Sequence, residues 1–356
     1  MAGSNRHDNT AAREVAALAW AGRQAEVVAA ADTALAAAGT GATERFELLE
    51  LRAESLVALG DLARADADAE ALKALARRER NVAMTARAQH CAALVQMRGG
   101  DAAAALKTAR RAVAAARRSG DRRVEARALT RLAEAQFRLH TLVRSKQAMT
   151  TARRAVDLAE ALGDKVLQGR ALWCLQAACN DLGRGAEADR AGAQSLVLAR
   201  ATGDLFGQAT ALNSLTFNES DVAAGLRLLK RALSLFRAAG FVERQAMVTS
   251  NLAGQYVELG LYRQAKRLEA AAIALERQTG ARHGLAGSLW KLAQLEATLG
   301  HADAARALAV EAAAQTAALG GTQYRGWPDW IAAHLATQAG RPAWRRHATS
   351  SAQPAR

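Results

Sequence analysis

The sequence predicts an all-α fold: a right-handed superhelical solenoid of stacked antiparallel helix pairs, with about eight repeats and a C-terminal cap. Three observations lead to this prediction. The chain has no proline before Pro328, so nothing breaks a helix outright over most of its 356 residues. Hydrophobic residues make up 51% of the chain but aromatic residues only 4%, which favours closely packed helices. Turn residues also recur at a regular spacing along the chain.

The turn residues form two interleaved series, each with a period of about 40 residues. The first series is Gly22, Gly60, Gly100, His140, Gly183, approximately Ser220, Gly260, Gly300 and Gly340. The second is Gly41, approximately Arg80, Gly120, Gly163, Gly203, Gly240, Gly280 and Gly320. Two series in one period predict two helices per repeat, each of about four turns and closed by a left-handed residue.

Local sequence around these turns predicts how the helices begin and where the repeat is irregular. An aspartate follows the glycine in SGDRR, LGDKV and TGDLF, so we expect Asp121, Asp164 and Asp204 to cap the next helix. The interval from His140 to Gly163 is about three residues longer than the others, and the interval from Gly203 to Gly240 is about three shorter. We expect irregular stacking in these two intervals.

Alanine recurs where neighbouring helices must approach closely. It stands five residues after a first-series turn at Ala65, Ala105, Ala188, Ala265 and Ala305, and twelve residues after it at Ala112, Ala152, Ala232, Ala272 and Ala312. Small side chains at both offsets allow the second helix to pack against the first helix and against the next repeat. An isolated helix pair cannot cover its own apolar face, so stacking has to supply the core.

The stretch NLAGQYVELGLYRQA resembles the tetratricopeptide repeat in the longer form, of about 40 residues, that occurs in bacterial signalling and regulatory proteins. The matching residues are Leu252, Ala253, Tyr256, Gly260, Tyr262 and Ala265. The resemblance extends over residues 9 to 345, although the proline that the family has near the end of the second helix is absent throughout. It implies a non-catalytic scaffold for protein–protein interaction that holds a peptide or protein segment in a concave groove.

The predicted domain organisation places the repeat solenoid at residues 9–320, after a disordered N-terminus at 1–8. The stretch GGTQYRGWPDW breaks the pattern, and Pro328 suits the first turn of a new helix. We therefore expect capping helices at 321–348 and a disordered tail at 349–356.

The sequence lacks the common signatures of catalysis and of cofactor binding. The sequence has no phosphate-binding glycine loop, no Gly-x-Ser-x-Gly elbow and no histidine or cysteine pair at metal-ligand spacing, so no enzyme activity, cofactor or metal is expected. Cys91, Cys174 and Cys179 make an odd number without a Cys-x-x-Cys pair, which is typical of a reducing compartment. The absence of a signal peptide and of a long apolar run favours the cytoplasm.

The family resemblance implies that the first helix of each repeat lines the groove, with the residue ten before the turn pointing inward. These candidates are Glu50, His90, Thr130, Trp173, Asn213, Trp290 and Trp330, with Arg127, Arg131, Arg138, Arg170 and Asn251 beside them. Arginine suits carboxylates because a guanidinium offers two parallel donors. Tryptophan and asparagine suit apolar groups and peptide backbone, respectively. Core packing is the alternative for the three tryptophans.

Positive charge concentrates in one segment. Residues 107–154 hold 14 basic and three acidic side chains, a net +11 of the whole chain's +14. The basic ridge, which we define as Arg110, Arg111, Arg117, Arg118, Arg122 and Arg123, lies on a second helix and its exit. Three interpretations stay open: a solvated surface that reflects coding bias, since 41 of the 48 basic residues are arginine, an acidic protein or peptide partner, or nucleic acid.

The leading prediction for the partner is a protein or peptide. Nucleic acid ranks below it because Phe137 is the only aromatic residue in residues 107–154, and single strands need aromatic platforms. No membrane partner is expected. Self-association stays open, as does a role as the sensory portion of a multidomain cyclase or transcription regulator.

Overall fold

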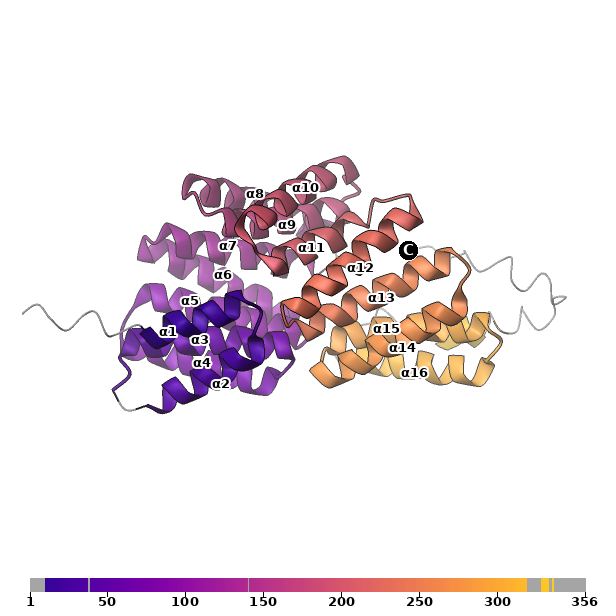
Figure 1. Cartoon of the computed structure of the whole chain (residues 1–356), viewed down its shortest axis with the longest axis horizontal. Coiled ribbons are helices and arrows are strands. Elements are labelled where there is room, and N and C mark those ends of the chain that lie inside the picture. Colours follow the sequence, from indigo (N-terminus) through magenta and orange to yellow (C-terminus); the bar gives the residue numbers. More distant parts are fainter. Residues whose placement is uncertain (1–9, 38, 140, 319–327, 333–334, 336–356) are drawn as a thin grey trace, which may run out of the picture. The chain divides into compact units, whose positions relative to one another are not determined.

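The computed structural model describes residues 10–37, 39–139, 141–318, 328–332 and 335 (Figure 1). In these residues the regular secondary structure is helical, as predicted, and no strand occurs. The helices are α1 (Thr10–Trp20), α2 (Gln24–Ala36), α3 (Ala42–Leu59), α4 (Leu62–Arg78), α5 (Val82–Arg98), α6 (Ala102–Ser119), α7 (Arg122–Phe137), α8 (Leu142–Ala161), α9 (Lys165–Asp181), α10 (Gly185–Thr202), α11 (Leu205–Leu215), α12 (Val222–Ala238), α13 (Val242–Glu258), α14 (Tyr262–Thr279), α15 (Arg282–Thr298) and α16 (Ala302–Ala318).

Most of the predicted turns are confirmed by their backbone conformation. Left-handed residues stand at Gly22, Gly60, Gly100, Gly120, Gly163, Gly183, Gly203, Gly240, Gly260, Gly280 and Gly300, and Arg80 adopts the same conformation with φ 50°. The prediction for Gly41 is wrong. Gly41 has φ −64° and precedes α3, while Gly39, with φ 94°, takes the left-handed position. His140, Gly320 and Gly340 lie outside the described residues.

The predicted caps are also confirmed, and the two intervals of unusual length contain helices of unusual length. The side chain of Asp164 accepts a hydrogen bond from the backbone N–H of Leu167 at 3.1 Å, and Asp121 and Asp204 cap α7 and α11 in the same way. The long interval after His140 produces α8, which has 20 residues. The short interval after Gly203 produces α11, which has only 11.

The ten alanines at the two small-residue offsets are all completely buried, with 0% of their surface exposed. The helices from α1 to α12 pack in successive pairs, as α15 and α16 do. The second helices α2, α4, α6, α8, α10 and α14 also pack against the first helix of the next repeat. The first helices α1, α3, α5, α7, α9 and α11 additionally contact one another in succession. Small side chains therefore perform the close-packing role expected of them.

The chain divides into two compact units, residues 1–245 (unit 1) and residues 246–356 (unit 2). The boundary falls inside α13, and the sequence gives no sign of it because Val242–Glu258 reads as one helix. Each unit is described separately below.

Unit 2 contains the stretch that most closely matches the repeat signature. Leu252, Ala253 and Ala265 are buried, and Tyr256 and Tyr262 pack against the apolar cluster that contains Ala253 and Ala265. A second apolar cluster joins α15 and α16 to residues 328–332, and it includes the completely buried Ile331. The predicted N-terminus 1–8, the tail 349–356 and most of the predicted cap 321–348 lie outside the described residues.

None of the helices in the described residues is long and apolar enough to cross a membrane. Cys91, Cys174 and Cys179 are free thiols, and all three are buried.

Candidate functional site

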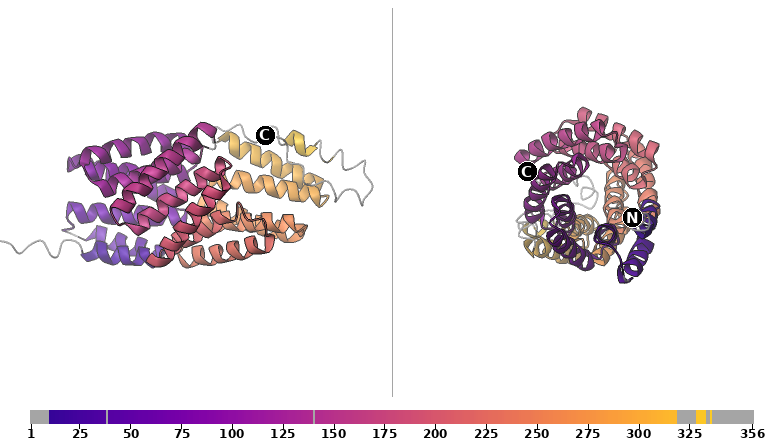
Figure 2. Two further views of the ribbon diagram at one scale, coloured as in Figure 1. Left: turned by 90° about the horizontal axis from the view of Figure 1, so that it is seen from above. Right: turned by 90° about the vertical axis from the view of Figure 1, so that its left-hand side faces the viewer.

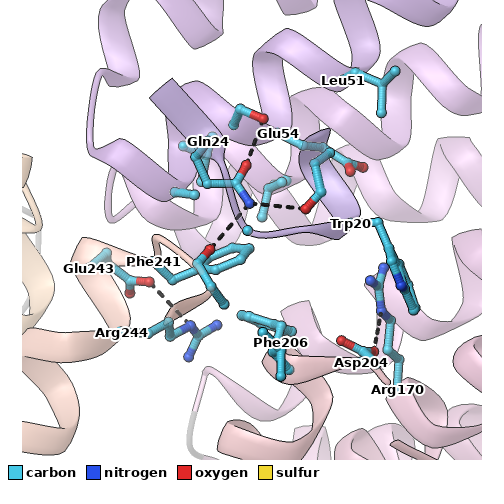
Figure 3. A pocket seen from close by; sticks show the side chains of 18 of the residues that line it. Trp20, Gln24, Leu51, Glu54, Arg170, Asp204, Phe206, Phe241, Glu243 and Arg244 are labelled. Atoms are coloured by element: carbon cyan, nitrogen blue, oxygen red, sulfur yellow. Dashed lines mark hydrogen bonds and ion pairs between the residues drawn. The ribbon is translucent and has the colours of Figure 1, made fainter. Parts of the chain in front are cut away.

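Unit 1 closes on itself through a contact between residues more than 200 positions apart. The Gln24 side-chain amide donates a hydrogen bond to the Ala239 carbonyl at 3.3 Å, and its oxygen accepts one from the Ser55 hydroxyl at 2.8 Å (Figure 3). The indigo end of the unit therefore lies beside its salmon end, which precedes α13 (Figure 2). We call this contact, made by Gly22, Gln24, Ala239 and Gly240, the clasp.

Two glycines make the clasp possible. Gly22 and Gly240 have φ 76° and 70°, a region that side chains of other residues disfavour. A Cβ on Gly22 would stand 2.5 Å from the Ala238 carbonyl oxygen, and a Cβ on Gly240 would stand 2.6 Å from the Gly22 oxygen. The two turns thus touch backbone to backbone, and neither position has room for even a methyl group.

The closed unit surrounds a cavity of about 320 Å³ (Figure 3). First helices supply most of its lining: α1, α3, α5, α7, α9, α11 and α13 all contribute. Apolar lining comes from Trp20, Leu51, Leu94, Leu167, Trp173, Phe206 and Phe241, and charged lining from Glu54, Arg98, Arg127, Arg131, Glu134, Arg170, Asp204, Glu243 and Arg244. The cavity therefore combines aromatic rings with charges of both signs.

Glu134 on α7 is the centre of the charged lining. Its carboxylate accepts hydrogen bonds from Arg98 at 3.1 Å and Arg138 at 3.2 Å, pairs with Arg131, and lies 3.6 Å from the Arg244 guanidinium. Burial alone raises the pKa of Glu134, but these four arginines outweigh it and hold that pKa well below its ordinary value. Glu134 is consequently ionised in the folded protein although it is only 4% exposed.

Arg244 brings α13 to the same cluster. Its Nε lies 3.2 Å from the Glu243 carboxylate, which is also 3.7 Å from Arg98. The Arg244 guanidinium stands 5.8 Å from the ring centres of both Trp173 and Phe206. We call Arg98, Arg131, Glu134, Arg138, Glu243 and Arg244 together the Glu134 cluster.

A second set of ion pairs lies beside this cluster. Glu50 binds Arg87 and lies 3.2 Å from Arg127, which is in turn 3.3 Å from Glu54. The two arginines outweigh the effect of burial and lower the pKa of Glu50. In this set the number of arginines equals the number of carboxylates.

No protein-family model matches the sequence, and no curated protein matches it either. Solved structures do match. A Rap protein complexed with competence and sporulation factor is 14% identical, with 92% of this chain and 98% of that chain covered and a TM-score of 0.59. A signal transduction ATPase with a tetratricopeptide repeat sensor from Pyrococcus horikoshii is 14% identical. The match covers 91% of this chain and 51% of that chain, with a TM-score of 0.51. The chain has the tetratricopeptide repeat fold. The quorum sensor NprR from B. thuringiensis shares this fold at 11% identity. The match covers 86% of this chain and 85% of that chain, with a TM-score of 0.51.

The tetratricopeptide repeats of unit 1 bring together half of the groove residues predicted from the sequence. Six of them line the cavity: His90, Arg127, Thr130, Arg131, Arg170 and Trp173. Glu50 and Arg138 pair with lining residues without lining the cavity themselves. Asn213 is buried, at 4% exposure, and is not one of the lining residues.

The other three predicted groove residues belong to unit 2 and do not line this cavity. Trp290 is 7% exposed and packs against Trp330 with the ring centres 5.5 Å apart. Both contact the apolar cluster of α15 and α16, so core packing describes Trp290. Asn251 is half-buried on α13.

The most connected charged residues of the cavity were absent from the predicted groove set. These residues are Arg98, Glu134, Glu243 and Arg244. One signal was available, because Arg98 and Arg138 stand at the same place in consecutive repeats, two residues before Gly100 and His140. An arginine that repeats beside a turn indicates a shared partner, here Glu134.

The basic ridge is fully on the surface. All six of its arginines are exposed, and none lines the cavity. Arg117 pairs with Glu125 at 3.0 Å and Arg123 lies 3.4 Å from Asp164. Nucleic-acid binding by the ridge stays an untested prediction. Among the described residues, no three His, Cys, Asp or Glu side chains cluster in a way that would hold a metal ion.

Acid is expected to unfold unit 1 through its buried carboxylates. Arginines lower the folded-state pKa values of Glu134, Glu50 and Glu243. The stabilisation from these groups is therefore complete at neutral pH, starts to fall below their unfolded pKa of about 4.3, and is lost as pH drops through the folded values. Urea unfolding of the intact chain at pH 7, 5, 4 and 3 would measure this. A midpoint that stays level between pH 5 and 3 would contradict it.

Proposed function

We propose that the protein is a non-catalytic interaction scaffold of the cytoplasm, and that unit 1 binds a short segment of a partner protein or a free peptide in its cavity. The observation that carries this proposal is the cavity itself. First helices of successive repeats converge on it with aromatic rings and charged groups. At about 320 Å³ it falls within the size range of specific ligand pockets and has room for only a few amino-acid residues.

The chemistry of the lining supports recognition of a peptide. Trp20, Trp173 and Phe206 supply flat apolar surfaces, and aromatic residues dominate the binding energy of most protein interfaces. Arg170 and Asp204, with a guanidinium to carboxylate separation of 3.8 Å, supply charges of both signs at the cavity wall. The structurally similar Rap protein is described in complex with competence and sporulation factor, and NprR as a quorum sensor. A signalling role is consistent with that similarity.

Selection from a random peptide display library, followed by affinity measurement on purified variants, tests the proposal. Trp20 and Arg170 line the cavity but are half exposed, at 49% for Trp20 and 46% for the Arg170 side chain, so their removal leaves the fold intact. We expect Trp20→Ala and Arg170→Ala each to weaken binding of the selected peptides by about tenfold or more.

Matched controls lie elsewhere on unit 1. Phe217 is an aromatic residue with 64% exposure, and Arg118 is an exposed member of the basic ridge. Phe217→Ala and Arg118→Ala should leave peptide affinity unchanged. The proposal fails if no peptide is enriched, or if the ridge and surface variants weaken binding as much as the cavity variants do.

A further inference from the structure

The Glu134 cluster contains more buried positive charge than negative charge. Within the part of the chain that the structure describes, this cluster brings four arginines, Arg98, Arg131, Arg138 and Arg244, around two carboxylates, those of Glu134 and Glu243. The Arg98 and Arg244 side chains are 8% and 3% exposed, so water does little to neutralise them. Buried charges normally need full compensation from partners of opposite sign. The neighbouring set formed by Glu50, Glu54 and their two arginines has that balance, whereas the Glu134 cluster does not.

Two buried hydrogen-bond donors also indicate that the cluster would gain from a further anion. Arg98 donates to Glu134 through Nη2, but its Nη1 is buried and has no hydrogen-bond partner among the described residues. The Nε of Arg131 is also buried without a partner there. Both residues line the cavity. Because leaving a charged donor unsatisfied is strongly unfavourable, an acceptor supplied from the cavity would stabilise this arrangement.

The electrostatics of Arg244 agree with this interpretation. Burial, together with the nearby Arg98, lowers the pKa of Arg244 to about 9. A guanidinium keeps its proton at neutral pH, so the low pKa reflects a cation that is held in unfavourable surroundings. A bound anion would offset the electrostatic cost of burying this cation.

We propose that the Glu134 cluster is a recognition site for one compact anionic group, a carboxylate, that enters the cavity between Arg98 and Arg131. Guanidinium groups bind carboxylates through paired, charge-assisted hydrogen bonds. The rings of Trp173 and Phe206 stand beside Arg244 and give this part of the cavity lining an apolar surface. The inference rests on the proposed function only for the source of the carboxylate, which would be an acidic side chain or the C-terminus of the bound peptide. A free small anion offers the same chemistry.

Small probes test the site without knowledge of the natural ligand. Glutarate, inorganic phosphate and the neutral analogue glutaramide would be titrated into the intact chain at matched ionic strength, by calorimetry and by thermal unfolding. We expect glutarate to bind and to raise the unfolding temperature, and glutaramide to do neither. Arg98→Met should weaken glutarate binding by about tenfold or more, whereas Arg118→Met, on the exposed ridge, should not change it.

A second readout separates recognition from a structural role. Because Arg98→Met removes surplus charge and leaves Glu134 with three arginines, the variant without probe should unfold at the wild-type temperature or above it. A purely structural Arg98 would instead give a less stable variant. Arg244→Met provides an independent version of the same test, since Glu243 keeps Arg98 as a partner. Loss of stability in both variants, or glutarate binding that both retain, would overturn the inference.

Two further peptide comparisons decide whether the carboxylate comes from a side chain or from the C-terminus of the peptide. Display-selected peptides would be compared with a free or an amidated C-terminus and with glutamate replaced by glutamine. Peptides that bind equally well without any carboxylate would refute the inference while leaving the proposed function standing. Glutarate or phosphate binding in the absence of any selected peptide would support the anion site and remove the peptide proposal.

Discussion

Glu134→Gln is expected to destabilise unit 1 by about 3–5 kcal/mol, the usual effect of removing one partner from a buried ion pair. The carboxylate of Glu134 is the common partner of Arg98, Arg131, Arg138 and Arg244. Without it, the four buried cations would lose the carboxylate that they share, and Glu243 would still pair with Arg98 and Arg244. The neutral glutamine keeps the volume of glutamate, so the loss reports charge compensation rather than a cavity.

Hydrogen exchange on peptides from α5, α7 and the start of α13 would measure this effect within unit 1, without assuming that the two units unfold together. The matched control is Glu125→Gln on the same helix. Glu125 pairs with Arg117 and Arg154, whose side chains are 48% and 58% exposed, so its replacement should change stability by less than about 1 kcal/mol. Equal effects at Glu134 and Glu125 would show that the cluster is screened by water.

Gly240→Ala and Gly22→Ala are expected to open the clasp. Any alanine in the left-handed region costs about 1–2 kcal/mol. At these two positions the new methyl group also meets backbone atoms at 2.5–2.6 Å, which forces the two turns apart. Gly120→Ala measures the cost of the left-handed backbone alone, because Gly120 has φ 71° and no atom lies within 4 Å of its Cβ position. We expect the clasp variants to lose about 1–3 kcal/mol more than Gly120→Ala.

The double variant gives a sharper result. Because Gly22 and Gly240 contribute to one contact, the second substitution should cost little beyond its own backbone strain once the first has separated the turns. Urea unfolding, with hydrogen exchange in α1 and α2 as the local probe, would measure the coupling. Strictly additive losses, or unchanged exchange in α2, would mean that the clasp does not hold unit 1 closed.

The repeat itself was predictable from the sequence because its determinants are local. A left-handed residue ends a helix wherever it occurs, so Gly60, Gly183 and even Arg80 marked helix ends correctly. The Gly41 error arose because Gly39 competes for the same role two residues earlier. Buried alanines such as Ala112 and Ala272 followed from spacing alone, since every helix pair needs the same close approach.

The candidate site was only partly predictable because it depends on distant packing. His90, Thr130 and Trp173 were found through their constant offset from a turn. Arg244 was not, because its proximity to Glu134 depends on the summed rotation of all the repeats between them. Its burial was hidden for a second reason: in a chain with 41 arginines, composition does not separate the few structural guanidinium groups from the many solvated ones.

The clasp also constrains how this protein can diverge. Repeat arrays commonly gain or lose a whole module with little disturbance, because each module interacts only with its neighbours. Here the turn at residue 22 must contact the turn at residue 240. Duplication or deletion of a repeat between them would shift one turn relative to the other by the length of one repeat, and the contact would be lost. The contact between residues 22 and 240 therefore fixes the number of repeats in unit 1. New binding specificity has to arise through substitution of the side chains that line the cavity.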